Sequence, residues 1–366
     1  MDTEELISKF QIKGELIKIK QNNEGHINTT FMSTFNDDGI IKKYTHQKIN
    51  KFAFKKPDHV MENITNITNH IQSKIKDMKD KEKRCLEVVF TKDNKPYFID
   101  KNGDYFRTYK FIDNVRTYQK IDNCNTAFHL GEAISTFQNQ LSDFDCSSLY
   151  DTIPNFHDMR MRYKSFKDAI IEDKFNRVKL VKNEIDYLLA NEERGYIIID
   201  EFKNNKLPLR VIHNDTKINN VLFNCDGSEA LSVIDLDTVM AGTILFDTGD
   251  MIRTATSTIE EDDINFQNMS LNLDYFKSLL EGYLSIASEY LTKREKELIV
   301  ESGRNITQIM AVRFLTDYIS GDVYYSISKE NHNVDRCRTQ IAFMKDFDKK
   351  SDALNQIIKE LYKKLR

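Results

Sequence analysis

Residues 213–220 read HNDTKINN, and this polar stretch lies between two short apolar segments. Residues 209–212 (LRVI) precede it and residues 221–223 (VLF) follow it, which predicts a strand, a polar loop and a second strand. A third apolar segment ends in Asp235 and Asp237. The chain therefore carries two sets of polar side chains, each next to the end of a predicted strand.

A turn signal separates the last two of these strands. Residues 224–227 (NCDG) have the composition of a hairpin turn. A hairpin would bring the loop that contains Asp215 near the strand end that contains Asp235.

The polar residues supply the parts that phosphoryl transfer to a hydroxyl requires. Such a reaction needs a carboxylate to accept the proton, oxygen ligands for Mg²⁺ and a cation near the phosphate charge. Asp215 fits the first role and Lys217 the last. The candidate metal ligands are Asn220, Asp235 and Asp237, because Mg²⁺ prefers hard oxygen ligands and keeps several waters. We therefore expect ATP and Mg²⁺ as cofactors. His213, placed directly after a buried strand, is expected to brace the loop by hydrogen bonding rather than to act as the base.

The composition indicates a folded chain without nucleic-acid or membrane partners. The 366 residues are 40% hydrophobic and 30% charged, which is enough apolar material for two lobes with separate cores. The net charge is -4, with acidic and basic residues mixed along the chain. The N-terminus is acidic and no run of about eighteen apolar residues occurs. The five cysteines are odd in number and form no Cys-x-x-Cys pair, so we expect a reducing, cytoplasmic location without a disulfide framework. We also expect a monomer.

Strand patterns dominate the N-terminal third. Residues 15–48 predict three strands of an antiparallel meander, and residues 57–77 predict an amphipathic helix that begins at Pro57. Further strand-like runs occupy residues 86–90, 96–99 and 105–112.

Helical patterns dominate from about residue 119 and are interrupted by the strand-rich residues 206–240. The clearest helical runs are residues 126–141, 166–190, 273–291 and 302–320. The pattern predicts an α+β fold of two lobes that join near residues 112–118. The first lobe, residues 1–112, is an antiparallel sheet with one helix, and the second, residues 113–366, is larger and mostly helical. A cleft between lobes is a common place for a small-molecule site.

The spacing His-x-Asp-x-x-x-x-Asn, with Lys217 two residues after the Asp, resembles the catalytic loop of protein kinases and of the aminoglycoside and choline kinase-like phosphotransferases. The second acid, Asp237, departs from the Asp-Phe-Gly of protein kinases and favours the small-molecule branch. Residues 25–30 (GHINTT), 213–221 and 233–240 (VIDLDTVM) look like the N-acetylhexosamine 1-kinases of that branch. Supporting stretches are residues 109–112, 152–158, 313–318 and 321–322. The resemblance implies a protein-kinase-like fold with an N-terminal nucleotide-binding lobe. It also implies transfer of the ATP γ-phosphate to the anomeric hydroxyl of N-acetylglucosamine or N-acetylgalactosamine.

The same resemblance assigns nucleotide-binding residues. Gly25, His26, Ile27 and Asn28 would fold over the phosphates through backbone N–H groups, although an ordinary hairpin turn explains them as well.

The third strand should present a cation, for which Lys48 is the candidate, paired with Glu62 on the following helix. A register shifted by one residue would instead turn Gln47 inward and leave no charged pair. The adenine edge would bond to backbone at Tyr109 and Phe111, where the lobes join.

In the helical lobe, Asp247 and Asp250 resemble acids that pin the catalytic loop, and helix N-capping is the alternative for Asp247. Arg313 and Tyr324 correspond to residues that contact the sugar in the resembling family, with Asp215 at its reacting hydroxyl. The alternative is that Arg313 is an ordinary salt-bridging helix residue.

Two other functions remain open from the sequence. One is the same reaction on choline, homoserine, a thiosugar or an aminoglycoside, for which the acidic residues 260–263 would suit a cationic acceptor unless they form a solvated loop. The other is a pseudokinase without turnover.

Overall fold

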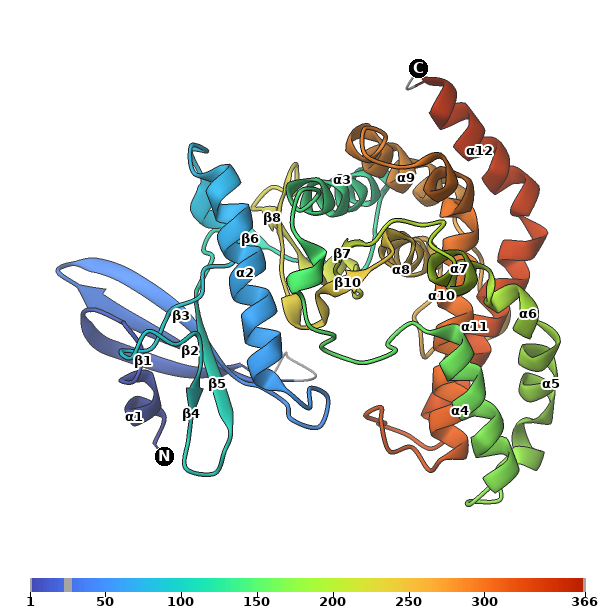
Figure 1. Cartoon of the computed structure of the whole chain (residues 1–366), viewed down its shortest axis with the longest axis horizontal. Coiled ribbons are helices and arrows are strands. Elements are labelled where there is room, and N and C mark those ends of the chain that lie inside the picture. Colours follow the sequence, from blue (N-terminus) through green and yellow to red (C-terminus); the bar gives the residue numbers. More distant parts are fainter. Residues whose placement is uncertain (1, 23–27, 365–366) are drawn as a thin grey trace. The chain divides into compact units, whose positions relative to one another are not determined.

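The computed structural model describes residues 2–22 and 28–364. The chain forms two compact units, each assembled from three separate segments (Figure 1). The first unit consists of Met1–Thr117, Gln140–Pro154 and Asn220–Ala241. The second consists of Tyr118–Asn139, Asn155–Asn219 and Gly242–Arg366. The units are therefore discontinuous in sequence, whereas the two predicted lobes are continuous.

The first unit is built on a five-stranded antiparallel sheet, whose long strands lie side by side in Figure 1. The strand order is β1 (Glu15–Asn22), β2 (Thr29–Asp37), β3 (Ile40–Lys48), β5 (Tyr105–Lys110) and β4 (Phe98–Ile99). Asp38 and Gly39 connect β2 to β3 with positive φ angles of 53° and 87°, as a tight hairpin requires. The predicted meander is confirmed. The strand expected at residues 86–90 is reduced to a single bridge between Val88 and Tyr109.

Two helices accompany this sheet. α1 (Thr3–Ile7), which the sequence pattern did not predict, places Leu6 and Ile7 in a core with Phe35 and Tyr44. α2 (Pro57–Ile75) is the predicted amphipathic helix, with Pro57 in its first turn and a fully buried apolar face (Val60, Met61, Ile64 and Ile67).

A second, three-stranded sheet completes the first unit and carries the predicted hairpin. Its order is β6 (Val115–Arg116), β8 (Val221–Asn224) and β9 (Ala230–Val233). The Asn63 side chain on α2 donates to the carbonyls of Tyr150 (2.8 Å) and Val239 (2.9 Å). This buried amide therefore joins three distant segments of the first unit.

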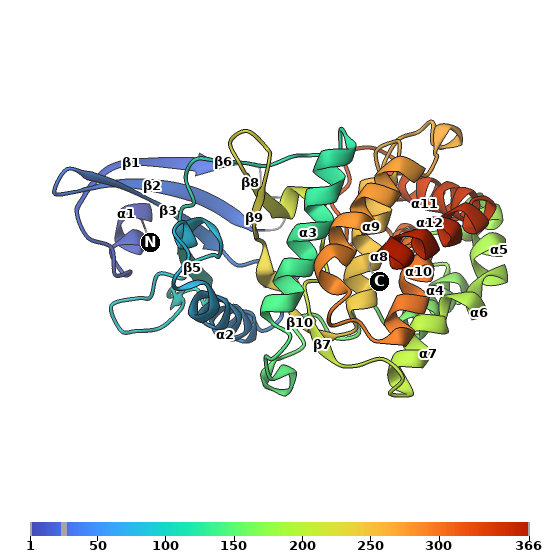
Figure 2. The same ribbon diagram turned by 90° about the horizontal axis from the view of Figure 1, so that it is seen from above.

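The second unit is mostly helical, and Figure 2 shows α8, α9 and α10 side by side within it. Its elements are α3 (Cys124–Gln140), α4 (Met159–Glu172), α5 (Lys182–Ala190), α6 (Glu192–Gly195), α7 (Ile197–Lys203), β7 (Arg210–Ile212), α8 (Ile244–Thr256), α9 (Leu273–Ala287), α10 (Lys293–Ile319), α11 (His332–Lys349) and α12 (Ser351–Lys364). The division between the units falls within β10 (Met240–Gly242).

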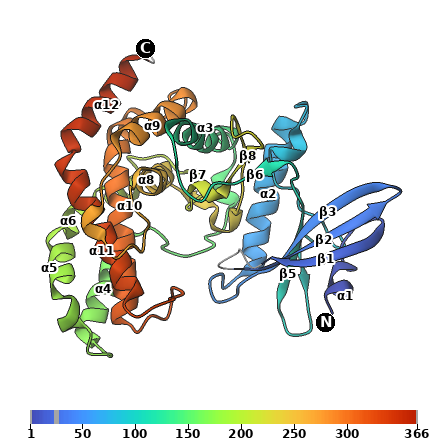
Figure 3. The same ribbon diagram turned by 180° about the vertical axis from the view of Figure 1, so that it is seen from behind.

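The helix predicted over residues 166–190 is two helices, α4 and α5, which pack against α10 in Figure 3. Asp173 ends α4 in the left-handed conformation with φ 35°. Its carboxylate then accepts from the N–H groups of Arg177 (2.8 Å) and Val178 (3.0 Å), so the chain turns instead of continuing as helix.

α8 packs closely on α10 at Gly249. A Cβ atom at this position would lie 2.4 Å from the carbonyl oxygen of Ser302, so the contact requires glycine. This packing fixes the helix that carries Asp247 and Asp250. Across residues 2–22 and 28–364, no helix is both long and apolar enough to cross a membrane.

Candidate active site

The polar loop that follows β7 is anchored by Asp247 on α8. The backbone N–H of His213 lies 3.0 Å from both carboxylate oxygens of Asp247, and that of Asn214 lies 2.7 Å from Oδ1. The N-cap of α8 is Thr243, which accepts from the N–H of Leu245. Asp247 therefore holds the loop and does not cap the helix.

Asp250, one turn further along α8, holds the middle of the same loop. Its Oδ2 accepts from the N–H of Thr216 at 2.9 Å, and its Oδ1 accepts from Arg253 at 2.9 Å. Burial raises the pKa of both Asp247 and Asp250, and the Arg253 charge opposes this rise for Asp250. The two acids that the sequence placed against this loop are in contact with it.

His213 braces the loop from within, as expected. Its ring is fully buried, and its Nδ1 accepts from the N–H of Asp215 at 3.2 Å. Asn214 adopts φ 68°, a left-handed conformation that Asn tolerates better than most residues. The backbone around Asp215 is thus fixed on both sides.

Asp215 and Lys217 form an ion pair of 3.0 Å, with side-chain exposures of 27% and 38%. A partly exposed carboxylate beside a cation can accept a proton from an incoming hydroxyl, while the cation offsets negative charge nearby. This pair belongs to the second unit.

Two of the predicted metal ligands, Asn220 and Asp235, lie at the open end of the β8–β9 hairpin in the first unit. The N–H of Ile234 donates to the carbonyl of Asn220 at 2.8 Å, which places Asn220 next to the end of the strand that precedes Asp235. Asp235 adopts a left-handed conformation with φ 60° and ψ 57°. An amide oxygen and a carboxylate are hard ligands, so these two residues would suit Mg²⁺, which prefers oxygen ligands. In the described part of the chain, no group of three or more His, Cys, Asp or Glu side chains is arranged to hold a metal.

Asp237, the third predicted ligand, is bound to a buried arginine. The Arg107 guanidinium donates to both carboxylate oxygens, with 3.0 Å from Nη2 to Oδ2. Asn28 adds a third hydrogen bond, 2.7 Å from its Nδ2 to Oδ2. Arg107 is 1% exposed and Asp237 is 3% exposed. Most acceptor positions of Asp237 are therefore used within the protein.

Lys48 does not form the expected ion pair with Glu62. Lys48 pairs with Asp104 at 2.5 Å on the protein surface, and Glu62 is exposed on α2. Gln47 points inward and accepts from Nε of Arg107 at 2.9 Å. The alternative register, with Gln47 turned inward, is therefore the observed one. The inward-facing cation is Arg107 on β5 and not a residue of β3. The nucleotide-binding role of Lys48 remains a prediction.

Of the predicted phosphate turn, residues 25–28, the structure describes only Asn28. Gly25, His26 and Ile27 lie outside the described residues. Asn28 is buried, donates to Asp237 and accepts from the N–H of Asn50 at 3.0 Å.

The predicted adenine contacts lie where β5 ends. Tyr109 is buried under the Arg107 guanidinium, which lies 5.2 Å from the ring centroid. The N–H of Phe111 donates to the carbonyl of Lys43 at 3.0 Å, so this donor is already used. Adenine binding at Tyr109 and Phe111 remains a prediction.

Arg313 and Tyr324, the predicted acceptor residues, are brought together in the second unit. The Arg313 guanidinium lies 4.8 Å from the ring centroid of Phe156, 5.7 Å from that of Tyr324 and 5.5 Å from that of Tyr325. Asp317 accepts from the N–H groups of Tyr324 (2.8 Å) and Tyr325 (3.0 Å), which holds both rings beside the arginine. Within the described residues, no carboxylate lies within 4.0 Å of Arg313, so the ordinary salt-bridge explanation does not hold.

The residues of this site from Asp215 to Asp250 lie within a segment that matches a known protein family. The profile of the APH phosphotransferase enzyme family matches residues 99–282, just over half of the chain. The chain belongs to this family.

Solved structures that resemble this phosphotransferase confirm its α+β, two-lobed fold. An aminoglycoside phosphotransferase from Alicyclobacillus acidocaldarius matches with a TM-score of 0.63 and 11% identity, over 98% of this chain and 97% of that one. A microcompartment-associated aminopropanol kinase matches with a TM-score of 0.56 and 11% identity, over 96% and 97%. The ADP-bound aminoglycoside phosphotransferase APH(2″)-Ib matches with a TM-score of 0.52 and 16% identity, over 95% and 99%.

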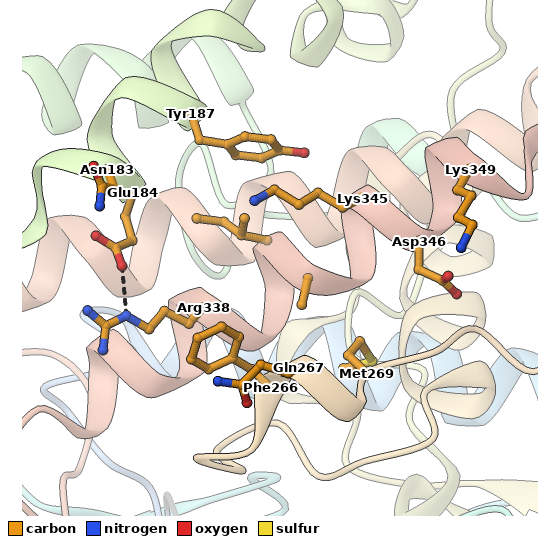
Figure 4. Close-up of a pocket in the computed structure, with 12 residues that line it drawn as sticks. Asn183, Glu184, Tyr187, Phe266, Gln267, Met269, Arg338, Lys345, Asp346 and Lys349 are labelled. Atoms are coloured by element: carbon orange, nitrogen blue, oxygen red, sulfur yellow. Dashed lines mark hydrogen bonds and ion pairs between the residues drawn. The ribbon is translucent and has the colours of Figure 1, made fainter.

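The second unit of the phosphotransferase also contains a cavity of about 410 Å³, shown in Figure 4. α5, α11 and residues 266–269 line it. Arg338 donates to Glu184 at 2.7 Å on one side, and Lys345 lies 4.8 Å from the ring centroid of Tyr187. None of the residues predicted to bind nucleotide, metal or acceptor lines this cavity.

Sequence reasoning missed Arg107 as a functional candidate. One signal was present, because Arg107 is one of two charged residues, with Lys110, in the otherwise uncharged predicted strand of residues 105–112. A buried arginine requires an acidic partner. The partner, Asp237, lies 130 positions away, so no local pattern could identify the pair.

Proposed function

We propose that this phosphotransferase transfers the γ-phosphate of ATP to the anomeric hydroxyl of N-acetylglucosamine or N-acetylgalactosamine. The loop geometry supports the phosphoryl-transfer part of this proposal. Asp247 and Asp250 hold the backbone on both sides of Asp215, and Asp215 is paired with Lys217. In phosphoryl transfer, positioning and electrostatic stabilisation supply nearly all of the catalysis, so a rigidly held carboxylate with a neighbouring cation is the expected arrangement.

Asp215 would accept the proton from the sugar hydroxyl, and Lys217 would offset negative charge on the phosphate. Asn220 and Asp235 would hold Mg²⁺. When bound, Mg²⁺ neutralises phosphate charge and orients the nucleotide. The ADP-bound aminoglycoside phosphotransferase of the same fold supports the assignment of an adenine nucleotide.

The charge of the acceptor cluster supports a neutral acceptor. Arg313 lies among Phe156, Tyr324 and Tyr325, and Arg162 contacts the same segment through the carbonyl of Phe156 at 2.6 Å. Burial and the neighbouring Arg313 lower the pKa of Arg162 to about 10, so it is still protonated at neutral pH. Two arginines disfavour a cationic acceptor such as choline or an aminoglycoside, whereas a neutral sugar can stack on the rings and accept hydrogen bonds.

Two of the acidic residues 260–263 already have basic partners within the protein. Glu261 pairs with Arg253 at 2.6 Å, and Asp262 lies 2.8 Å from His332. Part of this negative charge is therefore already matched by the protein.

The proposal is tested by measuring ATP consumption with N-acetylglucosamine, N-acetylgalactosamine, glucose, choline and kanamycin in parallel. We expect turnover only with the N-acetylhexosamines and a sugar 1-phosphate by phosphorus NMR. Turnover with choline or kanamycin alone would identify the alternative acceptor class. No turnover with any acceptor would support a pseudokinase.

A further inference from the structure

Arg107 is the centre of a buried polar network that lies entirely in the first unit. Its Nε donates to Gln47 on β3 at 2.9 Å, and both terminal nitrogens donate to Asp237. Asp237 in turn accepts from Asn28 at 2.7 Å, and Asn28 accepts from the N–H of Asn50 at 3.0 Å. One side chain thus joins β5, β3, the end of the predicted phosphate turn and the segment after β9.

The network includes Asp237, which lies two positions after the metal-ligand candidate Asp235. Asp235 has left-handed backbone angles, φ 60° and ψ 57°, and directly precedes the short 3₁₀ turn Leu236–Thr238 that contains Asp237. A non-glycine residue keeps such a conformation when its surroundings fix it. The two hydrogen bonds from Arg107 to Asp237 hold the 3₁₀ turn that directly follows Asp235.

Arg107 cannot act on a phosphate directly, because its side chain is 2% exposed and most of its donors are used. A buried ion pair is also an inefficient way to stabilise a fold, since well-packed apolar residues often serve as well. A role of this pair in positioning is therefore a better explanation than stability alone.

We propose that Arg107 is a positioning residue that fixes Asp235 through Asp237 and fixes the end of the phosphate turn through Asn28, and that Asp237 is a positioning carboxylate and not a metal ligand. This inference rests on the proposed role of Asp235 in holding Mg²⁺ for a nucleotide.

The test measures two quantities for the wild type and each variant. One is the affinity for a fluorescent ATP analogue with and without Mg²⁺, and the other is the melting temperature. No acceptor is needed, so an error in the sugar assignment would not affect the result. The decisive variant is the double substitution Arg107→Met with Asp237→Leu, which removes both charges. We expect it to recover the melting temperature lost in Arg107→Met alone, yet to bind the analogue with Mg²⁺ about 10- to 100-fold more weakly than the wild type.

Wild-type Mg²⁺-dependent affinity in the double variant would show a purely structural pair and overturn the inference. If that variant does not fold, Asn28→Ala decides, because it leaves Arg107 and Asp237 paired. Weaker Mg²⁺-dependent binding by Asn28→Ala would support the inference, and unchanged binding would contradict it.

Asp235→Asn and Asp237→Asn separate a ligand from a positioning group. We expect Asp235→Asn to abolish the Mg²⁺ dependence and Asp237→Asn to reduce it. Equal, complete loss in both variants would make Asp237 a ligand and overturn the assignment. Absence of any Mg²⁺-dependent binding by the wild type would refute the proposed nucleotide chemistry itself.

Discussion

The carboxylate of Asp247 accepts a 2.7 Å hydrogen bond from the backbone N–H of Asn214, the residue directly before Asp215. This bond connects α8, which is fixed against α10, to the loop that carries the proposed base. The position of Asp215 is therefore set by a helix and not by the loop alone.

Replacing Asp247 by Asn should slow turnover because one of the two accepting oxygens becomes an NH₂ group that faces backbone donors. We expect kcat to fall by about 100-fold, since small displacements of catalytic groups have effects of this size. Steady-state kinetics and the melting temperature would be measured together. The matched control is Asp168→Asn on the exposed face of α4, which should change neither quantity. An unchanged kcat in Asp247→Asn would contradict the positioning role.

Lys48→Met should leave the KM for ATP nearly unchanged, because Lys48 pairs with Asp104 at the surface and the inward charge is Arg107. The neighbouring lysine Lys51, which also pairs with Asp104 at 2.8 Å, gives the control variant Lys51→Met. A tenfold or larger rise in KM for ATP in Lys48→Met alone would restore Lys48 as the phosphate-binding cation.

Arg313→Met should raise the KM for the sugar by about tenfold and leave the KM for ATP unchanged. The guanidinium is the group that contacts all three rings of the acceptor cluster, and loss of one such contact is worth about 1–2 kcal/mol. Arg294→Met, near the start of the same helix, removes two ion pairs, with Glu201 and Glu297, and should have no kinetic effect. Equal changes in both KM values would argue against an acceptor-specific role.

The stability of the first unit should depend on pH through His46. Burial lowers the pKa of His46 to about 3, while in the unfolded chain it is near 6.5. Between these values the unfolded state binds the extra proton. Stability is therefore fully present above pH 6.5 and decreases as the pH falls towards 3, by at most about 1.4 kcal/mol per pH unit.

Urea unfolding of wild type and His46→Gln between pH 4.5 and 7.5 would measure this dependence. The variant should lose the hydrogen bonds to Ser33 and Thr108 and show a flatter pH dependence. Burial also lowers the pKa of His157 in the second unit, so some dependence should remain. A slope in His46→Gln equal to that of the wild type would contradict the assignment to His46.

Features that depend on local sequence were predictable. The meander, α2 and the β8–β9 hairpin follow from side-chain periodicity and turn residues, and the loop with Asp215 follows from its spacing. The break at Asp173 was missed because helical periodicity continues through it, and only the carboxylate that accepts from Arg177 ends the helix.

Features that depend on distant residues were not predictable. The inward position of Gln47 depends on strand register, and the inward cation depends on an ion pair between Arg107 and Asp237. The arrangement of Arg313 with Phe156 likewise joins residues far apart in the chain. Such pairs are set by tertiary packing, which a single sequence does not display.

The central claim is that Asp215 is the base. Its most direct test is the rate at which Asp215→Asn transfers phosphate from ATP to an N-acetylhexosamine, measured beside Mg²⁺-dependent nucleotide binding by the same variant. We predict that N-acetylhexosamine phosphorylation falls by about 100-fold or more while nucleotide affinity stays at the wild-type value. A variant that phosphorylates the sugar at the wild-type rate would contradict the assignment of Asp215 as the base.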